Sequence, residues 1–214
     1  MSQPVSDELA NFTILRQPAP ELGPRAQRTI ARIIEATREV FLSYGYAGTT
    51  IDEIAKVAKV SRASFYTYFP SKRDVLLAAG ARSSMQAQVL VEKIPGTVHT
   101  FDELSTWVSG YFAFLESEGA FAFAWTQAAT NDEEIRAAGL QRHIHMARRL
   151  GEVLIDIGGT GRTDALELGL AMFGLLDRTW AFAHLYGDSI DRGAVERTVS
   201  LSVWAAAHQD PTQV

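Results

Sequence analysis

The side chains best suited to chemistry gather on one short segment, residues 61–69, which reads SRASFYTYF. Arg62 carries a guanidinium fork that can bond guanine O6 and N7 together and so distinguish that base. Ser64 and Thr67 carry hydroxyl groups, which bond bases or phosphates. Arg62 alone would be an ordinary surface arginine, but a generic helix has no reason to expose arginine, serine, threonine and tyrosine on one short face. The group therefore indicates a surface that contacts duplex DNA.

Two helices joined by a tight turn must position these side chains. Thr50 and Glu53 form the capping-box pattern that begins a helix, and apolar residues recur through the run IDEIAKVAKV that follows. Ser61 begins a second helix, which ends before Pro70 because the residue before proline avoids helical backbone angles. In a helix-turn-helix unit the second helix lies in the major groove of DNA. The spacing therefore predicts a DNA-reading helix over residues 61–69.

The place of each side chain on these helices separates base contacts from phosphate contacts. We expect Arg62 and Ser64 to reach base edges, because the N-terminal residues of a recognition helix face the bases. Phosphate contacts fix the register of the protein on DNA without reading its sequence. Thr50 caps its helix whatever else it touches, so its hydroxyl group serves either as a helix cap alone or as a cap that also contacts phosphate. The residues that we expect to hold phosphates are Thr50, Thr67, Tyr68 and Lys72.

The distribution of charge is more informative than its total. The chain has a net charge of −5, which alone argues against binding to nucleic acid. Residues 25–73 contain nine basic and four acidic side chains, a balance of +5, so the remainder carries −10. A basic segment on an acidic body is expected when only one part of a protein meets phosphates. The alternative is a solvated, charged helix face.

The composition excludes several other classes of protein. The chain has no cysteine, which rules out disulfides, thiolate catalysis and cysteine-ligated zinc. His143 and His145 are two residues apart and point to different faces of a helix, so they make a poor metal pair. The sequence has no HExxH, GxSxG or phosphate-loop motif. We therefore expect no enzyme activity, no catalytic residue, no metal site and no cofactor.

The spacing of apolar residues predicts an all-α chain of about nine helices. One of these helices ends just before residue 117, and the next begins just after it. No segment alternates β-branched and polar residues as a strand would. We expect a flexible, proline-rich tail at 1–24, a helix-turn-helix domain at 25–74, a larger helical domain at 75–209 and a short tail at 210–214. The first residues do not resemble a signal peptide, and no run of 18 apolar residues occurs. We therefore expect a cytoplasmic protein that does not enter a membrane.

Aromatic residues line particular helices of the larger domain. Trp107, Tyr111 and Phe114 recur at spacings of four and three, which places them on one face of a helix. Such a face indicates a packed core, a subunit interface or an apolar ligand pocket. Asp177 lies in the otherwise apolar run AMFGLLDRTWAFA, where a buried carboxylate needs a partner. Asp177 is either paired locally, with Arg178 or with a residue such as His184 on a neighbouring turn, or it is a polar anchor for a ligand.

Residues 25–77 resemble the DNA-binding domain of the TetR family of transcriptional regulators. The match rests on Thr49–Thr50, the run IDEIAKVAKVS, the aromatic cluster FYTYF and the run PSKRDVL, in that order and without a gap. Lys59 and Ala63 stand where the family commonly has glycine. We expect Tyr66 to be partly buried, although it falls on a contact position of the family. The DNA-facing positions that the resemblance implies are Thr50, Arg62, Ala63, Ser64, Tyr66, Thr67, Tyr68 and Lys72.

The larger domain is similar to the ligand domain of one subgroup, the ethionamide-resistance repressors, through the segments WVSGYFAF, GLLDRTWAF and SVWAAA. In that subgroup an aromatic-lined channel accepts elongated apolar molecules. An asparagine is typical where this chain has Asp177. The resemblance implies a small apolar or aromatic ligand, held by the channel residues Trp107, Gly110, Tyr111, Phe114, Asp177, Trp180 and Trp204.

The same resemblance implies a homodimer through the last two helices, where small residues such as Gly169 and Gly174 would allow helices to approach closely. Two recognition helices of a dimer match successive major grooves of a palindromic operator in double-stranded DNA. We therefore expect a transcriptional repressor that a small apolar molecule releases from its operator. The alternative is a helical interaction protein without specific DNA binding, and salt-dependent binding to a palindromic fragment separates the two.

Overall fold

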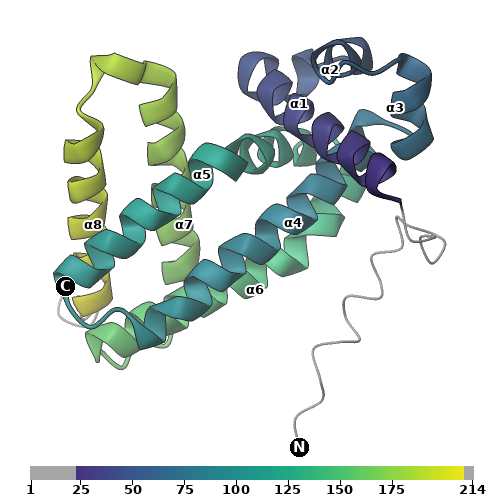
Figure 1. Cartoon of the computed structure of the whole chain (residues 1–214). Helices are drawn as coiled ribbons and strands as arrows, with labels where there is room; N and C mark the ends of the chain where they lie inside the picture. The colour runs from purple at the N-terminus through teal and green to yellow at the C-terminus, as the bar shows by residue number, and fades with distance from the viewer. Residues whose placement is uncertain (1–22, 210–214) are drawn as a thin grey trace, which may run out of the picture.

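The computed structural model describes residues 23–209, and its regular elements are all helical (Figure 1). The all-α prediction is confirmed, since no strand occurs in this part of the chain. Almost all of the predicted tails, 1–24 and 210–214, lies outside the described residues. The elements in chain order are α1 (Pro24–Gly48), α2 (Ile51–Val57), α3 (Arg62–Tyr68), α4 (Lys72–Lys93), the 3₁₀ turn η2 (Ile94–Gly96), α5 (Phe101–Ala129), α6 (Glu133–Gly158), α7 (Ala165–Tyr186), the 3₁₀ turn η3 (Gly187–Ser189) and α8 (Arg192–His208).

The helix starts follow from local sequence. Thr50 Oγ1 accepts a hydrogen bond from the backbone N–H of Glu53 (3.2 Å), whose carboxylate accepts one from the backbone N–H of Thr50 (2.9 Å). Thr100 and Glu103 form the same capping box at the start of α5. Ser61 caps α3 in the simpler way, through its side chain alone. These bonds satisfy amide groups that a helix leaves unpaired at its N-terminus, so neighbouring residues fix each start.

α5 is one continuous helix, where the sequence predicted two helices that meet near residue 117. The described residues therefore form eight α-helices instead of about nine. Gly119 lies inside α5 and faces the indole ring of Trp180 in α7, and a Cβ atom at this glycine would lie 2.4 Å from Trp180 Cζ3. The glycine thus allows α5 and α7 to pack closely, and it does not interrupt the helix.

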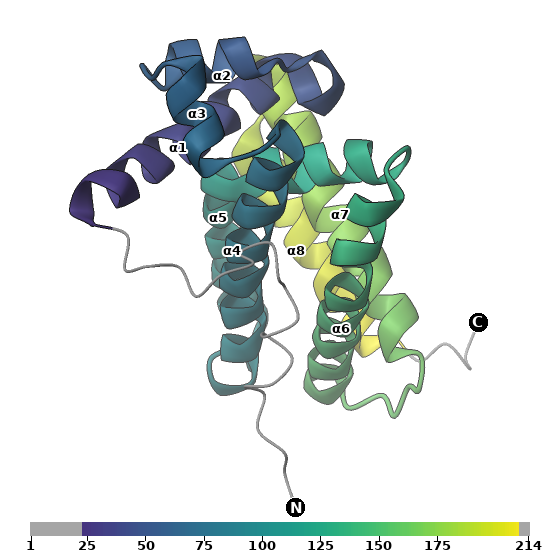
Figure 2. The same cartoon turned by 90° about the vertical axis from the view of Figure 1, so that its right-hand side faces the viewer.

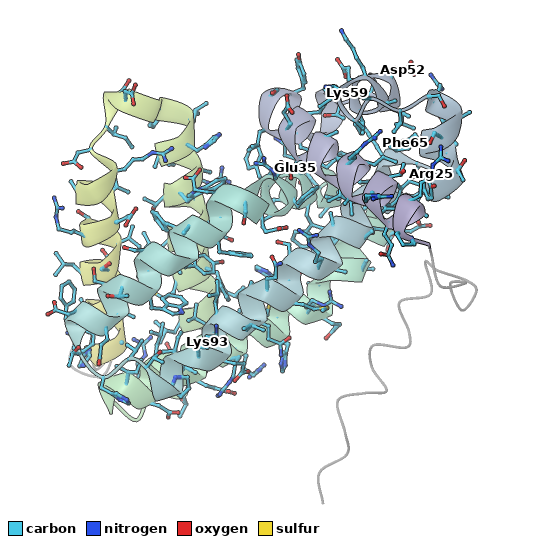
Figure 3. All side chains as sticks on the ribbon, viewed as in Figure 1. Arg25, Glu35, Asp52, Lys59, Phe65 and Lys93 are labelled. Atoms are coloured by element: carbon cyan, nitrogen blue, oxygen red, sulfur yellow. The ribbon has the colours of Figure 1, made fainter. Side chains whose placement is uncertain are left out.

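The first three helices enclose a small core of their own. Phe65 of α3 is fully buried and packs with Ile33 of α1, Ile54 of α2 and Val75 at the start of α4. Figure 3 shows Phe65 pointing into the space between these helices. Burying one such side chain contributes about 1.5–3 kcal/mol relative to leaving it exposed. Phe65 therefore holds α3 against α1 and α2 and leaves the opposite face of α3 to solvent.

The turn between α2 and α3 contains a lysine in the left-handed backbone conformation. Lys59 has φ of +53°, a value that glycine adopts without strain. Arg32 of α1 reaches this turn, where its guanidinium group donates hydrogen bonds to the carbonyl oxygens of Ala58 (3.2 Å) and Lys59 (2.9 Å). These bonds hold the turn in place, so the departure from the family's glycine is compatible with the helix-turn-helix.

The remaining helices form a body on which α1–α3 rest. α4 and α6 run side by side, α5 packs along α4, and α7 and α8 form a pair at one edge of the molecule (Figures 1 and 2). A second core cluster joins the two parts, because Phe41 of α1 packs against Leu76 of α4 and Phe121 of α5. The rings of Phe41 and Phe121 meet edge to face, with centroids 6.1 Å apart. A displacement of α4 or α5 is therefore transmitted to α1 through direct side-chain contacts.

α6 and α7 approach each other so closely that two glycines touch backbone atoms of the facing helix. A Cβ atom at Gly151 of α6 would lie 1.7 Å from the carbonyl oxygen of Ala165, and one at Gly169 of α7 would lie 1.7 Å from that of Ala147. Gly169 is buried within the chain. The expectation that it serves close approach between subunits is therefore wrong for Gly169, because this residue packs against α6 of the same chain. A Cβ atom at Gly174 would have no neighbour within 4 Å, so Gly174 stays available for close approach between subunits.

α4 belongs to both parts of the molecule. The boundary predicted between residues 74 and 75 falls inside this helix, whose Val75 packs in the core of α1–α3 while Val91 packs in the core of the body.

Residues 23–209 include no helix with the combination of length and apolar content that crossing a membrane requires.

Candidate functional site

α3 presents a narrow polar face to solvent beside α2. Because Phe65 fills the core, Tyr66 is turned away from it by about 100° around the helix. Tyr66 is 42% exposed, so the expectation that it would be partly buried gives way to an exposed side chain. Of the predicted DNA-facing residues on α3, the exposed ones are Arg62, Ala63, Tyr66 and Thr67, and the half-buried ones are Ser64 and Tyr68.

Arg62 is held in a fixed position by two neighbours. One terminal nitrogen of its guanidinium group donates hydrogen bonds to both carboxylate oxygens of Asp52 on α2 (2.7 and 2.8 Å). The other donates to the hydroxyl oxygen of Tyr66 (3.3 Å). The hydrogen bonds to Tyr66 and Asp52 and the negative charge of Asp52 raise the pKa of Arg62 above its ordinary value. The guanidinium group must exchange both partners for a guanine edge, and exposed pairs of this kind are weak enough to allow it.

Thr50 begins α2 with its hydroxyl group engaged in the helix cap. In addition to the bonds of the capping box, Thr50 Oγ1 donates a hydrogen bond to Glu53 Oε2 (2.8 Å). The bonds from the backbone and the hydroxyl group of Thr50 lower the pKa of Glu53. A phosphate at this end of α2 would compete with the Glu53 carboxylate for the same donors. The phosphate contact of Thr50 stays a prediction.

Lys72 has a structural role that the sequence did not predict. Its ammonium group donates hydrogen bonds to the carbonyl oxygens of Tyr46 (2.6 Å) and Thr49 (2.8 Å) and lies 4.6 Å from the centre of the Tyr46 ring. Burial lowers the pKa of Lys72, and the negative charge of Glu53 opposes that shift. The side chain therefore ties α4 to the end of α1. Its predicted contact with phosphate stays a prediction.

Replacing Lys72 with methionine is expected to lower the free energy of unfolding by about 1–2 kcal/mol, because two carbonyl groups lose a charged donor while the apolar stem remains. Urea denaturation at one protein concentration measures this change. Lys56→Met, at an exposed position of α2, is the matched control and should change the free energy of unfolding by less than about 0.5 kcal/mol. Equal effects of the two substitutions would show that the bonds of Lys72 do not stabilise the fold.

A hollow between the start of α1 and α3 gathers positive charge. Its lining includes Arg25, Arg28, Arg32 and Lys59, together with Ser64 of α3. Figure 3 shows Arg25 and Lys59 on the same part of the molecule as α3. Cations that replace the counterions of duplex DNA supply much of the affinity of a DNA-binding protein. The hollow therefore places positive charge, which is suited to phosphates, beside the residues that are suited to read bases.

A cavity of about 140 Å³ lies within the body, between α4, α5, α6 and α7. Its walls are mainly apolar and include Leu76 of α4, Phe121 and Trp125 of α5, Met146 of α6 and Phe173 of α7. An apolar cavity of about 150 Å³ is large enough to bind benzene. The volume of the cavity is therefore suited to a small molecule with one ring, and it is small for the elongated molecules that the subgroup resemblance implies.

The cavity brings together three of the seven predicted ligand residues, Tyr111, Phe114 and Asp177. Of the other four, Trp107 donates its indole N–H to the carbonyl oxygen of Leu90 (2.9 Å). Gly110 is exposed on the surface of α5. Trp180 also lies outside the lining and donates its indole N–H to Glu116 Oε1 (3.0 Å). Trp204 lies outside it too, and its ring packs against Phe101 and His208.

Two polar residues of the cavity lining, Asp177 and Tyr111, are bonded to each other. The Tyr111 hydroxyl group donates a hydrogen bond to Asp177 Oδ1 (3.0 Å). Burial raises the pKa of Asp177 to about 6, and this hydrogen bond opposes the shift. Burial, together with the negative charge of Asp177, raises the pKa of Tyr111 well above its ordinary value. The partner of Asp177 is thus neither Arg178 nor His184, the two that its position on the helix suggests.

Sequence reasoning missed the contributions of α4 and α6 to the cavity. α6 supplies Arg142 and His143, and burial lowers the pKa of His143. Two small residues in the lining, Gly80 of α4 and Gly139 of α6, leave room for the cavity and for the Trp125 ring. The available signal was the presence of glycines inside long predicted helices, which often marks a packing or functional reason.

The sequence matches known bacterial regulators. Residues 33–79 fit the family described as "Bacterial regulatory proteins, tetR family". The HTH-type transcriptional regulator EthR of Mycobacterium tuberculosis is 32% identical over 150 residues, which cover 66% of this chain and 68% of EthR. The HTH-type transcriptional regulator SrpR of Pseudomonas putida is 40% identical over 60 residues, 28% of each chain.

Solved structures share the fold. The fatty acid degradation regulator FadR of Bacillus halodurans superposes with a TM-score of 0.63 at 22% identity, covering 82% of this chain and 94% of that one. FadR of Bacillus subtilis, solved in complex with stearoyl-CoA, gives a TM-score of 0.61 at 20% identity over 82% and 98% of the two chains. The helix-turn-helix, the helical body and the identity to EthR lead to one conclusion: the chain belongs to the TetR family of bacterial transcriptional regulators.

Proposed function

We propose that this chain is a repressor that binds a palindromic operator as a homodimer and leaves it when a small apolar or aromatic molecule fills the cavity. The observation that carries the proposal is the polar face of α3. Arg62 and Tyr66 are exposed there, next to a hollow lined by Arg25 and Arg28. A protein that only binds other proteins has no need for a base-reading arginine beside phosphate-binding cations.

The edge formed by α7 and α8 supports the homodimer. It exposes large apolar side chains, which are rare on monomer surfaces when they occur together. Phe182 and Tyr186 stack with ring centroids 5.8 Å apart and nearly parallel planes. The small residues Gly174 and Ala171 are exposed on the same helix. The exposed apolar side chains of the two helices are Leu170, Phe182, Leu185 and Tyr186 on α7 and Leu201 on α8.

The position of the cavity supports control of DNA binding by a ligand. Leu76 and Phe121 line the cavity, and both also pack against Phe41 of α1 in the cluster that joins body and helix-turn-helix. A ligand that moves α4 or α5 therefore moves α1 and, with it, α3. Such a ligand weakens DNA binding only to the extent that it favours one arrangement of the dimer over the other.

Selection from a random pool of DNA duplexes tests the proposal. We expect the protein to enrich an inverted repeat whose half-sites lie one helical turn, or a whole number of turns, apart. Sedimentation of the selected duplex should then show an even number of chains per duplex. Enrichment of no sequence would contradict the proposal and favour a helical interaction protein instead.

A further inference from the structure

Asp177 is the one carboxyl group among the described residues that line the cavity, and one of its two oxygens accepts no hydrogen bond from them. Oδ1 accepts the hydrogen bond from Tyr111, whereas no residue within 23–209 donates a hydrogen bond to Oδ2. The rest of the surrounding wall is mainly apolar, with Phe114 and Phe173 next to Tyr111. Asp177 is half-buried, and a carboxylate beside an apolar wall is stabilised when a donor or an opposite charge meets it.

The other ionisable groups of the cavity do not supply that charge. α5 contributes Tyr111, α6 contributes Arg142 and His143, and α4 contributes no ionisable group to the lining. Arg142 directs its guanidinium group to the α4 side, where it donates a hydrogen bond to the carbonyl oxygen of Ala81 (3.3 Å). Burial lowers the pKa of His143, so its imidazole is neutral at pH 7. Burial and the Tyr111 bond determine the pKa of Asp177, so no cation of the described residues offsets its charge.

We propose that the cavity selects a small primary amine that carries one aromatic ring, and that the ammonium group of this ligand binds the free oxygen of Asp177. The inference rests on the proposed function, because it names the ligand class of the same cavity. An ammonium group at Asp177 also lies near the Tyr111 hydroxyl group, which is bonded to the other carboxylate oxygen.

The size of the cavity sets the rest of the ligand. A volume of about 140 Å³ limits the ligand to a single ring with at most a short arm, because an apolar cavity of about 150 Å³ binds benzene. The ring then packs among Phe121, Trp125 and Met146, while the arm reaches Asp177. Benzylamine has this arrangement of ring, arm and ammonium group and is a suitable probe.

Four probes of nearly equal shape separate charge from size: benzylamine, benzyl alcohol, benzoate and toluene. Ligand-observed NMR titrations of the full chain at pH 7.5 should show benzylamine binding at least tenfold more tightly than any of the other three. In Asp177→Asn, which keeps the shape of the side chain, this preference should disappear. Tyr111→Phe should retain it, because the carboxylate stays. Tighter binding of benzoate or benzyl alcohol, no saturable binding of benzylamine, or an amine preference that survives Asp177→Asn would overturn the inference.

The dependence of binding on pH provides a second readout. With a pKa of about 6, Asp177 is ionised at pH 7.5, whereas only about a tenth of it is ionised at pH 5. Benzylamine stays protonated throughout this range, so its affinity should fall about tenfold between pH 7.5 and pH 5. The affinity for benzyl alcohol should stay constant, as should both affinities in Asp177→Asn. A constant affinity for benzylamine in the unmodified protein would contradict the inference.

Release of DNA is measured separately, so that failure of the inference and failure of the proposed function can be told apart. Benzylamine that binds with the expected selectivity but leaves the operator complex intact would support the amine site and contradict release by a ligand. Release of the operator by benzyl alcohol or benzoate, with no preference for benzylamine, would support the proposed function and overturn the amine site.

Discussion

Arg62→Ala is expected to lose most of its preference for the selected operator over a scrambled duplex of the same length. Arg62 is the exposed arginine at the N-terminal end of α3, where a recognition helix meets base edges. A bidentate contact between arginine and guanine typically discriminates that base on the order of tenfold to a hundredfold. Each protomer of a dimer loses one such contact. Fluorescence anisotropy with both duplexes at one salt concentration measures the ratio of affinities.

Thr67→Ala is the matched control for this prediction. Thr67 is also exposed on α3, but its hydroxyl group donates to the carbonyl oxygen of Ala63 (3.0 Å), and we expect it to meet phosphate. Its loss should weaken binding to operator and scrambled duplex by the same factor, because phosphate contacts carry no sequence information. If Thr67→Ala changed the ratio and Arg62→Ala did not, the assignment of the base contact to Arg62 would be wrong.

Gly169→Ala is expected to lower the free energy of unfolding by about 3 kcal/mol, at the upper end of the range for overpacked sites. The added Cβ would lie 1.7 Å from the carbonyl oxygen of Ala147, and 3.0 Å from the backbone nitrogen of Gly151. Both neighbours are backbone atoms, which cannot rotate away as a side chain does. α6 and α7 must therefore separate, and the cavity between them changes shape. Urea denaturation at a fixed protein concentration measures the loss of stability.

Gly110→Ala supplies the opposite expectation from the same type of substitution. Gly110 lies inside α5 on the surface, and a Cβ there meets no atom within 4 Å. Alanine at an exposed helical position should therefore raise the free energy of unfolding by about 0.5–1 kcal/mol. Destabilisation by Gly110→Ala, or no destabilisation by Gly169→Ala, would contradict the helix packing described above.

Local features of the fold could be predicted from the sequence. The caps at Thr50, Ser61 and Thr100 involve residues that are three positions apart, so a short run of sequence contains all the atoms that matter. The alternation of apolar and polar positions then fixes which face of each helix is buried. For this reason the sequence correctly predicted an all-α chain and assigned the helix-turn-helix to the family.

Contacts between distant helices could not be predicted in the same way. Lys72 meets the end of α1 only after α4 has folded back against it, and Gly119 faces Trp180 through the packing of α5 on α7. The sequence therefore offered a phosphate contact for Lys72 and a helix break near residue 117. The helix break followed a local rule that the tertiary packing overrides, whereas the phosphate contact of Lys72 stays a prediction.

The residues that line the cavity could be predicted only in part. Tyr111, Phe114 and Asp177 reach it from α5 and α7, whose register the family resemblance supplies. Trp107 and Trp180 lie on the same helices, but each turns its indole N–H to another partner. Which aromatic residue lines a cavity depends on rotations and distances between helices, and neither is encoded in the spacing along one helix.

Anisotropy titrations of the selected operator and of a scrambled duplex, at about 150 mM salt, measure sequence-specific DNA binding directly. We expect the operator to bind at least about a thousandfold more tightly than the scrambled duplex. Both affinities should fall as salt increases, because the cations beside α3 displace counterions of DNA. Equal affinity for the two duplexes would contradict a sequence-specific repressor.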